Sequence, residues 1–332
     1  MTGEIERAPA EICAVICTHD RTELLCRALH SLAEQSLRPA EILVIDNAPS
    51  DSSTRHLMLE RFPDVGYVCE PKPGLNFARN RALRETQREI VAYMDDDAVA
   101  DPDWILRTAE VFAESPRIAI CTGRVRAYRL ETEAQRLFEA QGGFDRGTQR
   151  IHMPRDAGHR LMQGLRAPLI AWSIAIGVGA CLAVRRSSLR TIGNFDIALD
   201  LGAALPGGGD VDVIWRSLDA GFEVVYEPRA VVLHEHRREL DEVYAQIFGH
   251  RRAEIAFLTK SFRAARGHRR FVILAFLSWR LLKPGLRLLR RLAFRDEPLP
   301  ATALWRLWGA SWRGLASYAQ ASRLAAERSV RT

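Results

Sequence analysis

Several patterns that assign a protein to a class at first sight are missing from this 332-residue sequence. Its six cysteines include no C-x-x-C pair, which argues against a zinc or redox pair of that kind and favours a reducing, cytoplasmic compartment. No run of about 18 apolar residues occurs, so we expect no transmembrane helix. Residues 1–6 lack the basic-then-apolar order of a secretory signal, which also favours the cytoplasm.

Two glycine-rich nucleotide-binding motifs are absent as well. No G-x-G-x-x-G follows the first predicted strand, and no G-x-x-x-x-G-K-[ST] occurs anywhere in the chain. Gly177-Val178-Gly179 lacks the third glycine and lies in the middle of the sequence. If the protein binds a nucleotide, it therefore uses neither the dinucleotide fingerprint nor a P-loop.

Positive charge is concentrated at one end of the chain, although the net charge is only +6. Residues 1–233 carry 27 Lys and Arg against 33 Asp and Glu, whereas residues 234–332 carry 20 against 8. The basic excess therefore belongs to the C-terminal third alone. We expect an α/β domain over residues 1–238 and a basic, aromatic-rich helical region over residues 239–332.

The C-terminal region combines apolar and aromatic residues with many arginines. Residues 271–279 are apolar on every side but too short to span a bilayer, and Trp305, Trp308 and Trp312 lie among arginines. This composition is typical of helices in a membrane interface, so we expect attachment to the anionic inner face of the cell membrane. The alternative is a helical subdomain packed on the first domain. Nucleic acid is not expected as a partner, because no recognised binding module accompanies the charge.

Strand and helix patterns alternate over the first hundred residues. Strands are predicted over 11–17, 42–45, 65–69 and 90–94, and helices over 23–35, 52–61 and 75–85. This order predicts an α/β fold with a parallel sheet and right-handed crossovers. Residues 131–168 are polar and contain several glycines, which predicts a mobile segment over the site.

Two of these strands run directly into carboxylates. Asp46 follows the second strand, and Asp95, Asp96 and Asp97 end the fourth. Adjacent carboxylates repel one another unless a cation neutralises them, and oxygen ligands suit Mg²⁺ or Mn²⁺, which usually also hold substrate phosphates. Because α/β sheets bind ligands beyond the carboxyl ends of their strands, the pattern predicts a metal–nucleotide site there. An acidic surface turn is the alternative, since aspartate favours turns.

The second candidate functional segment is the glycine loop at 207–209, which leads into a predicted helix. Asp210 lies near the start of that helix, where it is either a functional carboxylate or simply an N-cap. Asp212 suits the first turn because of the helix dipole. Further on, one histidine of the pair His234 and His236 is a candidate third metal ligand, although such pairs also occur as ordinary surface.

Six motifs in this order resemble those of the family 2 glycosyltransferases, over about residues 11–236. They are 14–21, similar to the family's opening strand and "P-T-Y-N-R" loop; 45–51, similar to "V-D-D-G-S-x-D"; 74–80, similar to "G-x-x-x-A-R-N"; 94–97, which matches the metal-binding D-x-D; 179–196, similar to "G-x-N-x-A-x-R-R … G-G-F-D"; and 208–212, similar to "G-E-D-x-D". The departures are Cys17, His19, Asn47, Cys181, Asn194 and Gly209, the last of which replaces a glutamate.

The resemblance implies the GT-A fold, a Rossmann-like and mostly parallel α/β architecture, here with a helical C-terminal extension. It implies inverting transfer of a sugar from a nucleotide-diphosphate donor to a hydroxyl of a saccharide or lipid-linked acceptor, in cell-surface polysaccharide or glycoconjugate synthesis. The implied cofactor is Mn²⁺ or Mg²⁺. The implied site residues are the metal ligands Asp95, Asp97 and His234; the donor-binding residues Thr18, Asp46, Arg79, Asp95 and Asp96; and the catalytic base Asp210.

Two other functions share part of this pattern. A non-catalytic, membrane-peripheral partner of a polysaccharide assembly would keep the fold, and Gly209 in place of glutamate favours it, while the intact Asp95, Asp97 and Asp210 argue against it. A sugar-nucleotide pyrophosphorylase would need a glycine-rich loop with Arg or Lys directly after the first strand. The residues at 18–21, Thr-His-Asp-Arg, do not form such a loop.

Overall fold

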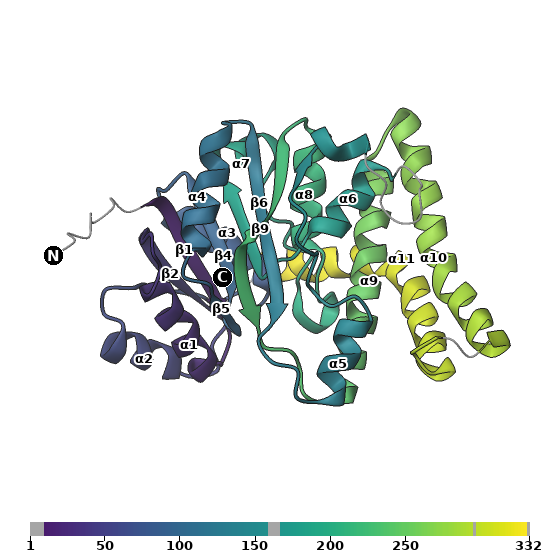
Figure 1. Cartoon of the computed structure of the whole chain (residues 1–332), viewed down its shortest axis with the longest axis horizontal. Helices are drawn as coiled ribbons and strands as arrows, with labels where there is room; N and C mark the ends of the chain where they lie inside the picture. The colour runs from purple at the N-terminus through teal and green to yellow at the C-terminus, as the bar shows by residue number, and fades with distance from the viewer. Residues whose placement is uncertain (1–9, 159–166, 295–296, 331–332) are drawn as a thin grey trace.

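The computed structural model describes residues 10–158, 167–294 and 297–330, and a nine-stranded mixed sheet lies at its centre (Figure 1). The strand order is β3-β2-β1-β4-β8-β6-β9-β5, and β7 pairs with β9 beside this path. The first half of the sheet comprises β1 (Ala10–Thr18), α1 (Thr22–Ala33), β2 (Pro39–Asn47), α2 (Ser53–Arg61), β3 (Gly66–Glu70), α3 (Leu75–Glu85) and β4 (Ile90–Asp95). Strands β1 to β4 pair in parallel, which confirms the predicted α/β arrangement.

Both faces of this half-sheet are buried, because alternate residues of each strand pack against different helices. In β1, Ile12, Ala14 and Ile16 join the core under α1, α2 and α4 (Trp104–Glu114), whereas Cys13 and Val15 join the core under α3 and α8 (Gly209–Asp219). A strand covered on both faces reads as a continuous apolar run, as β1 and β4 do. The carboxyl ends of the strands are therefore the free edge at which polar side chains gather.

The second half of the sheet contains the antiparallel strands of this mostly parallel architecture. Strand β8 lies between β4 and β6 and is antiparallel to both, and β5 is antiparallel to β9. This half comprises β5 (Ala98–Ala100), α4 (Trp104–Glu114), β6 (Ile118–Ala127), α5 (Glu133–Ala140), β7 (Ile151–Met153), η1 (Arg155–Gly158), α6 (Leu169–Ile176), β8 (Cys181–Arg185), α7 (Arg186–Ile192), η2 (Gly202–Ala204), α8 (Gly209–Asp219) and β9 (Glu223–His234). An apolar run does not reveal the direction of a strand, so this reversal could not be predicted from the sequence.

The segment 131–168 is more ordered than its composition suggested. Helix α5 begins with a capping box between Thr132 and Gln135, and β7 extends the sheet. Residues 159–166, where part of the expected mobile segment falls, lie outside the described residues. The loop after α5 carries Phe144, whose ring lies 5.1 Å from that of His234. This segment is therefore adjacent to the end of β9.

Three long helices follow the sheet: α9 (Leu240–Ala264), α10 (Gly267–Phe294) and α11 (Ala301–Val330). They pack on the α/β body, since Phe257 of α9 is fully buried beside Ile170, and Ala321 of α11 lies in one cluster with Phe77. The end of α11 reaches the loop after β3, where Lys72 Nζ donates to Ser329 O at 3.1 Å. In the described part of the chain, none of the helices combines the length and apolarity needed to cross a membrane.

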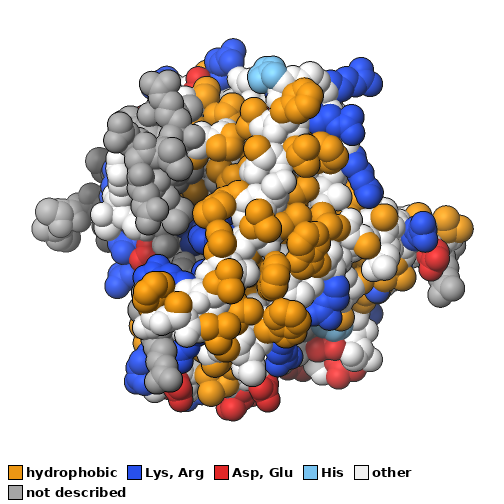
Figure 2. Space-filling view, turned by 90° about the vertical axis from the view of Figure 1, so that its right-hand side faces the viewer, with side chains coloured by type: hydrophobic (Ala, Val, Ile, Leu, Met, Phe, Trp, Pro, Cys, Tyr) orange, Lys and Arg blue, Asp and Glu red, His pale blue; other side chains and the backbone are white. Residues whose placement is uncertain are grey.

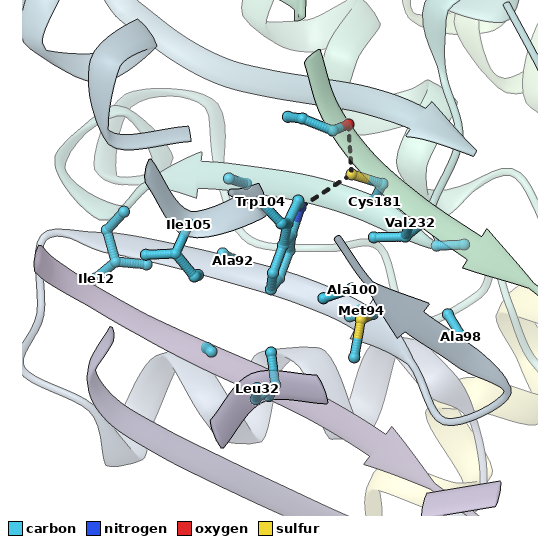
Figure 3. Close-up of a cluster of buried hydrophobic side chains, with 14 of the residues drawn as sticks. Ile12, Leu32, Ala92, Met94, Ala98, Ala100, Trp104, Ile105, Cys181 and Val232 are labelled. Atoms are coloured by element: carbon cyan, nitrogen blue, oxygen red, sulfur yellow. Dashed lines mark hydrogen bonds between the residues drawn. The ribbon is translucent and has the colours of Figure 1, made fainter. Parts of the chain in front are cut away.

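Close packing around Cys181 fixes the junction of β8, β6 and β9 (Figure 3). The indole Nε1–H of Trp104 donates to Cys181 Sγ at 3.1 Å, and this sulfur also lies against Ala230 O. A Cβ added at Gly123 would stand 2.2 Å from Ala230 O and 2.3 Å from Cys181 Sγ. Cys181, one of the departures from the family motif, therefore depends on glycine at position 123, because any side chain there would collide with its sulfur atom.

We predict that Gly123→Ala lowers the free energy of unfolding by about 1–3 kcal/mol or more, because the new methyl group overlaps backbone that cannot move aside. Gly309→Ala is the matched control: it lies inside α11 with nothing within 4 Å of the added Cβ, so it should stabilise by roughly 0.5–1 kcal/mol. Denaturant unfolding of both variants measures the difference. Equal stabilities would contradict the packing described for β6.

Candidate active site

The register of the parallel strands brings the predicted site residues to one edge of the sheet. Thr18 of β1 pairs with Asp46 of β2, and Cys17 pairs with Asp95 of β4. These positions are the carboxyl ends of their strands, where an α/β sheet opens into a crevice. Strand β9 brings His234 to the same place, opposite Ala98 of β5.

Asp95, Asp97 and His234 form a cluster that can hold a metal ion. One ligand atom from each lies within 4.8 Å of the others, and Asp97 Oδ1 is 3.1 Å from His234 Nε2. Asp97 Oδ1 is buried, and the group that faces it is the His234 ring, itself a potential ligand of the same ion. Ligands of one octahedral ion stand about 3 Å apart when the metal–ligand distance is about 2.1 Å. The two carboxylates, the imidazole and their spacing therefore fit a small divalent cation.

The electrostatics of this cluster are those of a site built for positive charge. Burial and the neighbouring Asp97 raise the pKa of Asp95. Burial also opposes ionisation of Asp97, but His234 and Arg21 outweigh it and hold the pKa of Asp97 below its usual value. Burial likewise works against protonation of His234, while Asp97 more than compensates and raises the pKa of the imidazole.

Asp96 lies beside this cluster but is occupied by protein donors. Thr18 Oγ1 donates to its Oδ2 at 2.8 Å, and Arg21 donates to its Oδ1 at 3.1 Å. Burial, followed by the charge of Asp97, raises the pKa of Asp96 to about 6 despite these bonds. Arg21 also reaches Asp97 Oδ2 at 3.1 Å, so one guanidinium holds two of the three adjacent carboxylates. The structure thus places the predicted pair Thr18 and Asp96 in contact with each other.

Asp46 is fully buried at the end of β2. Tyr67 Oη donates to its Oδ2 at 2.8 Å, whereas its Oδ1 has no partner in the described residues. Burial raises the pKa of this carboxyl group. A buried acceptor without a donor costs free energy, so Oδ1 is a position where an N–H or O–H of a ligand would be stabilised.

One cleft of about 1110 Å³ extends from the metal cluster to α8, α9 and α10. Arg79, Asp95, Asp97, Asp210 and His234 all line it. Three other predicted site residues lie at the same edge of the sheet but do not line the cleft: Thr18, Asp46 and Asp96. The cleft is slightly larger than the usual ligand pocket of about 300–1,000 Å³, so it has room for more than one ligand.

Arg79 anchors the centre of the cleft from α3. Its side chain is buried and donates to Asn76 Oδ1 at 3.1 Å and to Asp200 Oδ2 at 3.3 Å. A Cβ at Gly179 would lie 2.7 Å from Arg79 Nη2 and 3.5 Å from Asp210 Oδ2, so glycine leaves the room in which these two groups face the cleft. The guanidinium therefore lies among Asp200, Asp210 and Asp95 and balances their charge.

Asp210 is not the N-cap of α8. The helix begins at Gly209, the cap position is Gly208 with φ of 97°, and no side chain caps it. The interpretation of Asp210 as a capping residue is therefore wrong. Its carboxylate makes no hydrogen bond or ion pair with any other residue in the described ranges and lines the cleft. Its position in the first turn places a negative charge where the helix dipole favours it.

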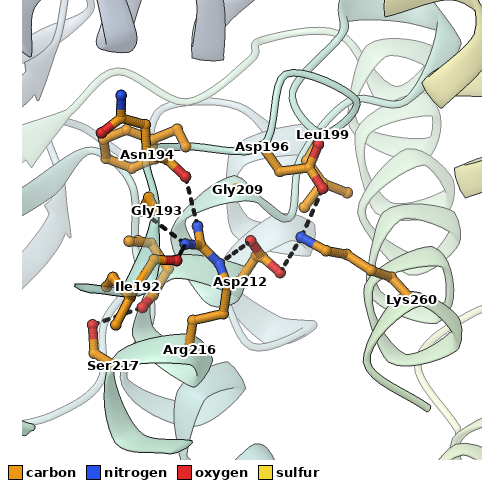
Figure 4. Close-up of polar contacts among 12 residues, drawn as sticks. Ile192, Gly193, Asn194, Asp196, Leu199, Gly209, Asp212, Arg216, Ser217 and Lys260 are labelled. Atoms are coloured by element: carbon orange, nitrogen blue, oxygen red, sulfur yellow. Dashed lines mark hydrogen bonds and ion pairs between the residues drawn. The ribbon is translucent and has the colours of Figure 1, made fainter. Parts of the chain in front are cut away.

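Asp212, two residues later, does not line the cleft but lies in a buried network of ion pairs (Figure 4). Its side chain is buried, accepting from Arg216 Nε at 2.8 Å and from Lys260 Nζ at 2.6 Å. Lys260 also pairs with Asp196 at 2.7 Å and thereby ties α9 to the loop before α8. The two acids of the motif at 208–212 thus divide into one that faces the cleft and one that holds the fold.

Two residues of the site were missed in the sequence, Arg21 and Asp200. Arg21 is part of the opening-loop motif, so its position after β1 was a usable signal. Asp200 gave no signal, because only folding brings its Oδ2 to 2.8 Å from Gly209 N. A Cβ at position 209 would lie 2.1 Å from Asp200 Oδ2 and 2.3 Å from Asn76 Nδ2. Glycine at 209 is therefore required by the carboxylate of Asp200 next to it.

Fold and site together define a GT-A protein with an acidic, metal-compatible cleft. The chain belongs to the family described as glycosyl transferase family 2, which matches residues 13–193. The match contains Asp46, Arg79 and the three adjacent aspartates, and it ends before Asp210 and His234.

Similar proteins support the same assignment. The "Pre-mycofactocin glycosyltransferase" of Mycobacterium tuberculosis is 27% identical over 213 residues, which are 64% of this chain and 41% of that protein. This chain thus spans about two fifths of that relative's length. The "Succinoglycan biosynthesis protein ExoM" of Rhizobium meliloti is 27% identical over 268 residues, 77% of this chain and 74% of that protein. A mannosyltransferase structure from Pyrobaculum calidifontis shares the fold, with a TM-score of 0.56 and 17% identity over 97% of this chain and 90% of that one.

We predict that Asp97→Asn abolishes or strongly weakens Mn²⁺ binding, since an amide oxygen carries no charge to replace the carboxylate. The fold should survive, because the residue lies at the edge of the sheet. Mn²⁺ titration followed by electron paramagnetic resonance measures the loss. Asp64→Asn, which removes an exposed carboxylate far from the cluster, is the control and should bind Mn²⁺ like the wild type. Equal binding by both variants would place the ion elsewhere.

Proposed function

We propose that the protein is a metal-dependent, inverting glycosyltransferase that moves a sugar from a nucleotide-diphosphate donor to an acceptor hydroxyl. The observation that carries this proposal is the arrangement of the cleft: a three-residue metal cluster and a separate carboxylate without a partner, Asp210, line one cavity. The P. calidifontis mannosyltransferase that shares the fold is a complex with GDP-Man and Mn²⁺, which supports the donor class and the metal.

The donor would lie along the carboxyl edge of the sheet. Asp95, Asp97 and His234 would hold Mn²⁺ or Mg²⁺, which when bound neutralises charge on the departing diphosphate. The unpartnered Asp46 Oδ1 would accept a hydrogen bond from the nucleoside, and Thr18 would hold Asp96 in place through its hydrogen bond. Arg79 would stabilise negative charge at the centre of the cleft. The motifs implied direct donor binding for Thr18 and Asp96 as well, but Asp96 is held by Thr18 and Arg21, so we propose that these two residues act indirectly.

Asp210 would take the proton of the acceptor hydroxyl. As that oxygen attacks the anomeric carbon, a new glycosidic bond forms and the bond to the diphosphate breaks, and the configuration inverts. A base of this kind must be ionised and free to accept a proton. The absence of any hydrogen bond or ion pair to the Asp210 carboxylate among the described residues meets the second condition.

Substitution of Asp210 by Asn tests the proposal, because asparagine has the same shape but cannot take the proton. Asp210→Asn should retain wild-type thermal stability and Mn²⁺-dependent donor binding, and its turnover should fall roughly a hundredfold or more. Asp212→Asn is the matched control. It breaks a buried network with Lys260 and Arg216, so it should lose about 1–3 kcal/mol of stability while the folded enzyme still turns over.

Transfer is measured with a panel of nucleotide sugars and saccharide or lipid-linked acceptors. Wild-type turnover by Asp210→Asn would contradict the assignment of the base. Donor binding by the wild type with no transfer to any acceptor would favour a non-catalytic partner of a polysaccharide assembly, the alternative function.

We further propose that the protein works at the surface of an anionic membrane, through α10. The outward face of this helix carries an apolar patch, visible in the view onto the α10 side of the molecule (Figure 2). Its members are Phe271, Val272, Leu274, Trp279, Leu282, Leu286, Leu289, Leu292 and Phe294, each at least 42% exposed. An exposed apolar stripe with flanking arginines suits the boundary between headgroups and acyl chains. The packing of α9 and α11 on the body is compatible with this role for α10.

The double variant Leu286→Glu/Leu289→Glu should bind vesicles that contain phosphatidylserine roughly tenfold more weakly, because two half-exposed leucines can no longer enter the interface. Stability should change little, since neither leucine is part of the core. Vesicle sedimentation measures the partition. Leu59→Glu, on α2 at the opposite end of the molecule, is the control for an exposed leucine and should bind like the wild type (Figure 1). Unchanged partition of the double variant would overturn the membrane proposal.

A further inference from the structure

The end of the cleft away from the metal is lined by positive charge from α9 and α10. Arg251 comes from α9, and Arg280, Lys283 and Arg287 come from one face of α10. Arg146, from the loop after α5, lies between these residues and Asp210, and its Nε has no hydrogen-bond partner in the described ranges. The cleft therefore runs from a carboxylate-rich end to a cation-rich end.

The carboxylates nearby do not balance these cations. Glu254 accepts from Arg251 Nη1 at 3.0 Å and from Arg280 Nη2 at 2.6 Å, so it serves two guanidinium groups. Glu297 pairs with Arg287. Lys283 has no hydrogen bond or ion pair with any residue in the described ranges. Among these side chains the positive charges outnumber the negative ones, and Lys283 is the cation without a partner.

The surroundings make this excess costly. Burial, opposed by Glu254 and reinforced by Arg280 and Arg287, lowers the pKa of Arg251 to about 10. Burial, followed by Arg280, Arg251 and Arg287, also lowers the pKa of Lys283. Half-buried charges of one sign are stabilised when an anion joins them. The cluster is therefore poised for an anionic ligand that enters through the cleft.

The position of Lys283 on α10 indicates where that ligand comes from. Trp279 and Leu286 lie four residues before and three residues after it, so they are its neighbours on the helix surface. Both belong to the exposed apolar patch, at 51% and 50% exposure. The cations of the cleft thus border directly on the apolar surface that faces outward, an arrangement that matches a molecule with an anionic head and an apolar chain.

We propose that Arg251, Arg280, Lys283 and Arg287 form a subsite for the phosphate or diphosphate group of a lipid-linked acceptor. The lipid chain would leave across Trp279 and Leu286, and the acceptor sugar would extend along the cleft to Asp210. This assignment rests on the proposed function and deepens it, since it names the acceptor as a lipid phosphate. A phosphate group suits the cluster because guanidinium groups bind it in fixed geometry and lysine adds a point charge.

Inorganic pyrophosphate is the first probe, titrated calorimetrically into the full chain in EDTA, where no metal can hold it at the acidic end. The wild type should bind it, Lys283→Gln should bind roughly tenfold more weakly or worse, and Lys283→Arg should retain binding. Arg266→Gln is the control, because it removes one charge from an exposed position next to α10 and outside the cleft. No binding by the wild type, or equal loss in Lys283→Gln and Arg266→Gln, would overturn the subsite.

Farnesyl diphosphate is the second probe, because it adds an apolar chain to the same anion. It should bind the wild type more tightly than pyrophosphate does, and Trp279→Ser should remove this advantage while leaving pyrophosphate binding unchanged. Leu59→Ser, at an exposed leucine of α2, should not alter it. Equal affinities for the two probes would assign the subsite to soluble phosphates and overturn the lipid source.

These measurements need neither metal nor transfer, so they fail separately from the proposed function. If pyrophosphate binds at Lys283 but Asp210→Asn keeps full turnover, the base is wrong and the subsite stands. If Asp210→Asn is inactive and pyrophosphate does not bind, the enzyme assignment stands and the subsite is wrong.

Discussion

Negative charge gathered at the carboxyl edge of the sheet is the constraint on which the rest of the site depends. Parallel pairing brings Asp46 and Asp95 to the same edge, and Asp97 follows two residues later. Carboxylates this close are stable only with cations beside them. The chain supplies these cations from segments far apart in the sequence: Arg21 after β1, Arg79 in α3 and His234 at the end of β9. Folding thus places positively charged side chains next to the carboxylates at one edge of the sheet.

The C-terminal helices are part of the same construction. Lys260 of α9 bonds to Asp212 of α8 and pairs with Asp196, and Tyr318 of α11 donates to Asp196 at 2.8 Å. These contacts hold the loop that carries Asp200 and, through α8, the position of Asp210. The helical region therefore both completes the wall of the cleft and presents the apolar face of α10 outward.

Two departures from the family motifs have physical reasons in the structure. Cys181 fills a tight junction in which Trp104 donates to its sulfur and Gly123 leaves room for it. Gly209 gives its space to Asp200, whose carboxylate accepts from the Gly209 amide. The family's glutamate is absent at position 209, and the carboxylate of Asp200, from the loop before α8, lies beside that position instead. A departure that favoured a non-catalytic protein in the sequence is, in three dimensions, a rearrangement of acidic groups within the cleft.

The α/β fold, the parallel strands β1 to β4 and the family could all be predicted from the sequence, because apolar periodicity and ordered motifs are local properties of the chain. The same holds for the position of Asp95 to Asp97 at the end of a strand. The antiparallel direction of β8 depends on packing, since an apolar run has no direction, and so does the division in which Asp210 faces the cleft while Asp212 is buried with Lys260. Asp200, the contacts of Arg21 and the cations around Lys283 emerge from the folded chain, because each is defined by a neighbour distant in sequence. Spacing along the chain predicts which face a side chain takes, but which charges meet is decided by packing.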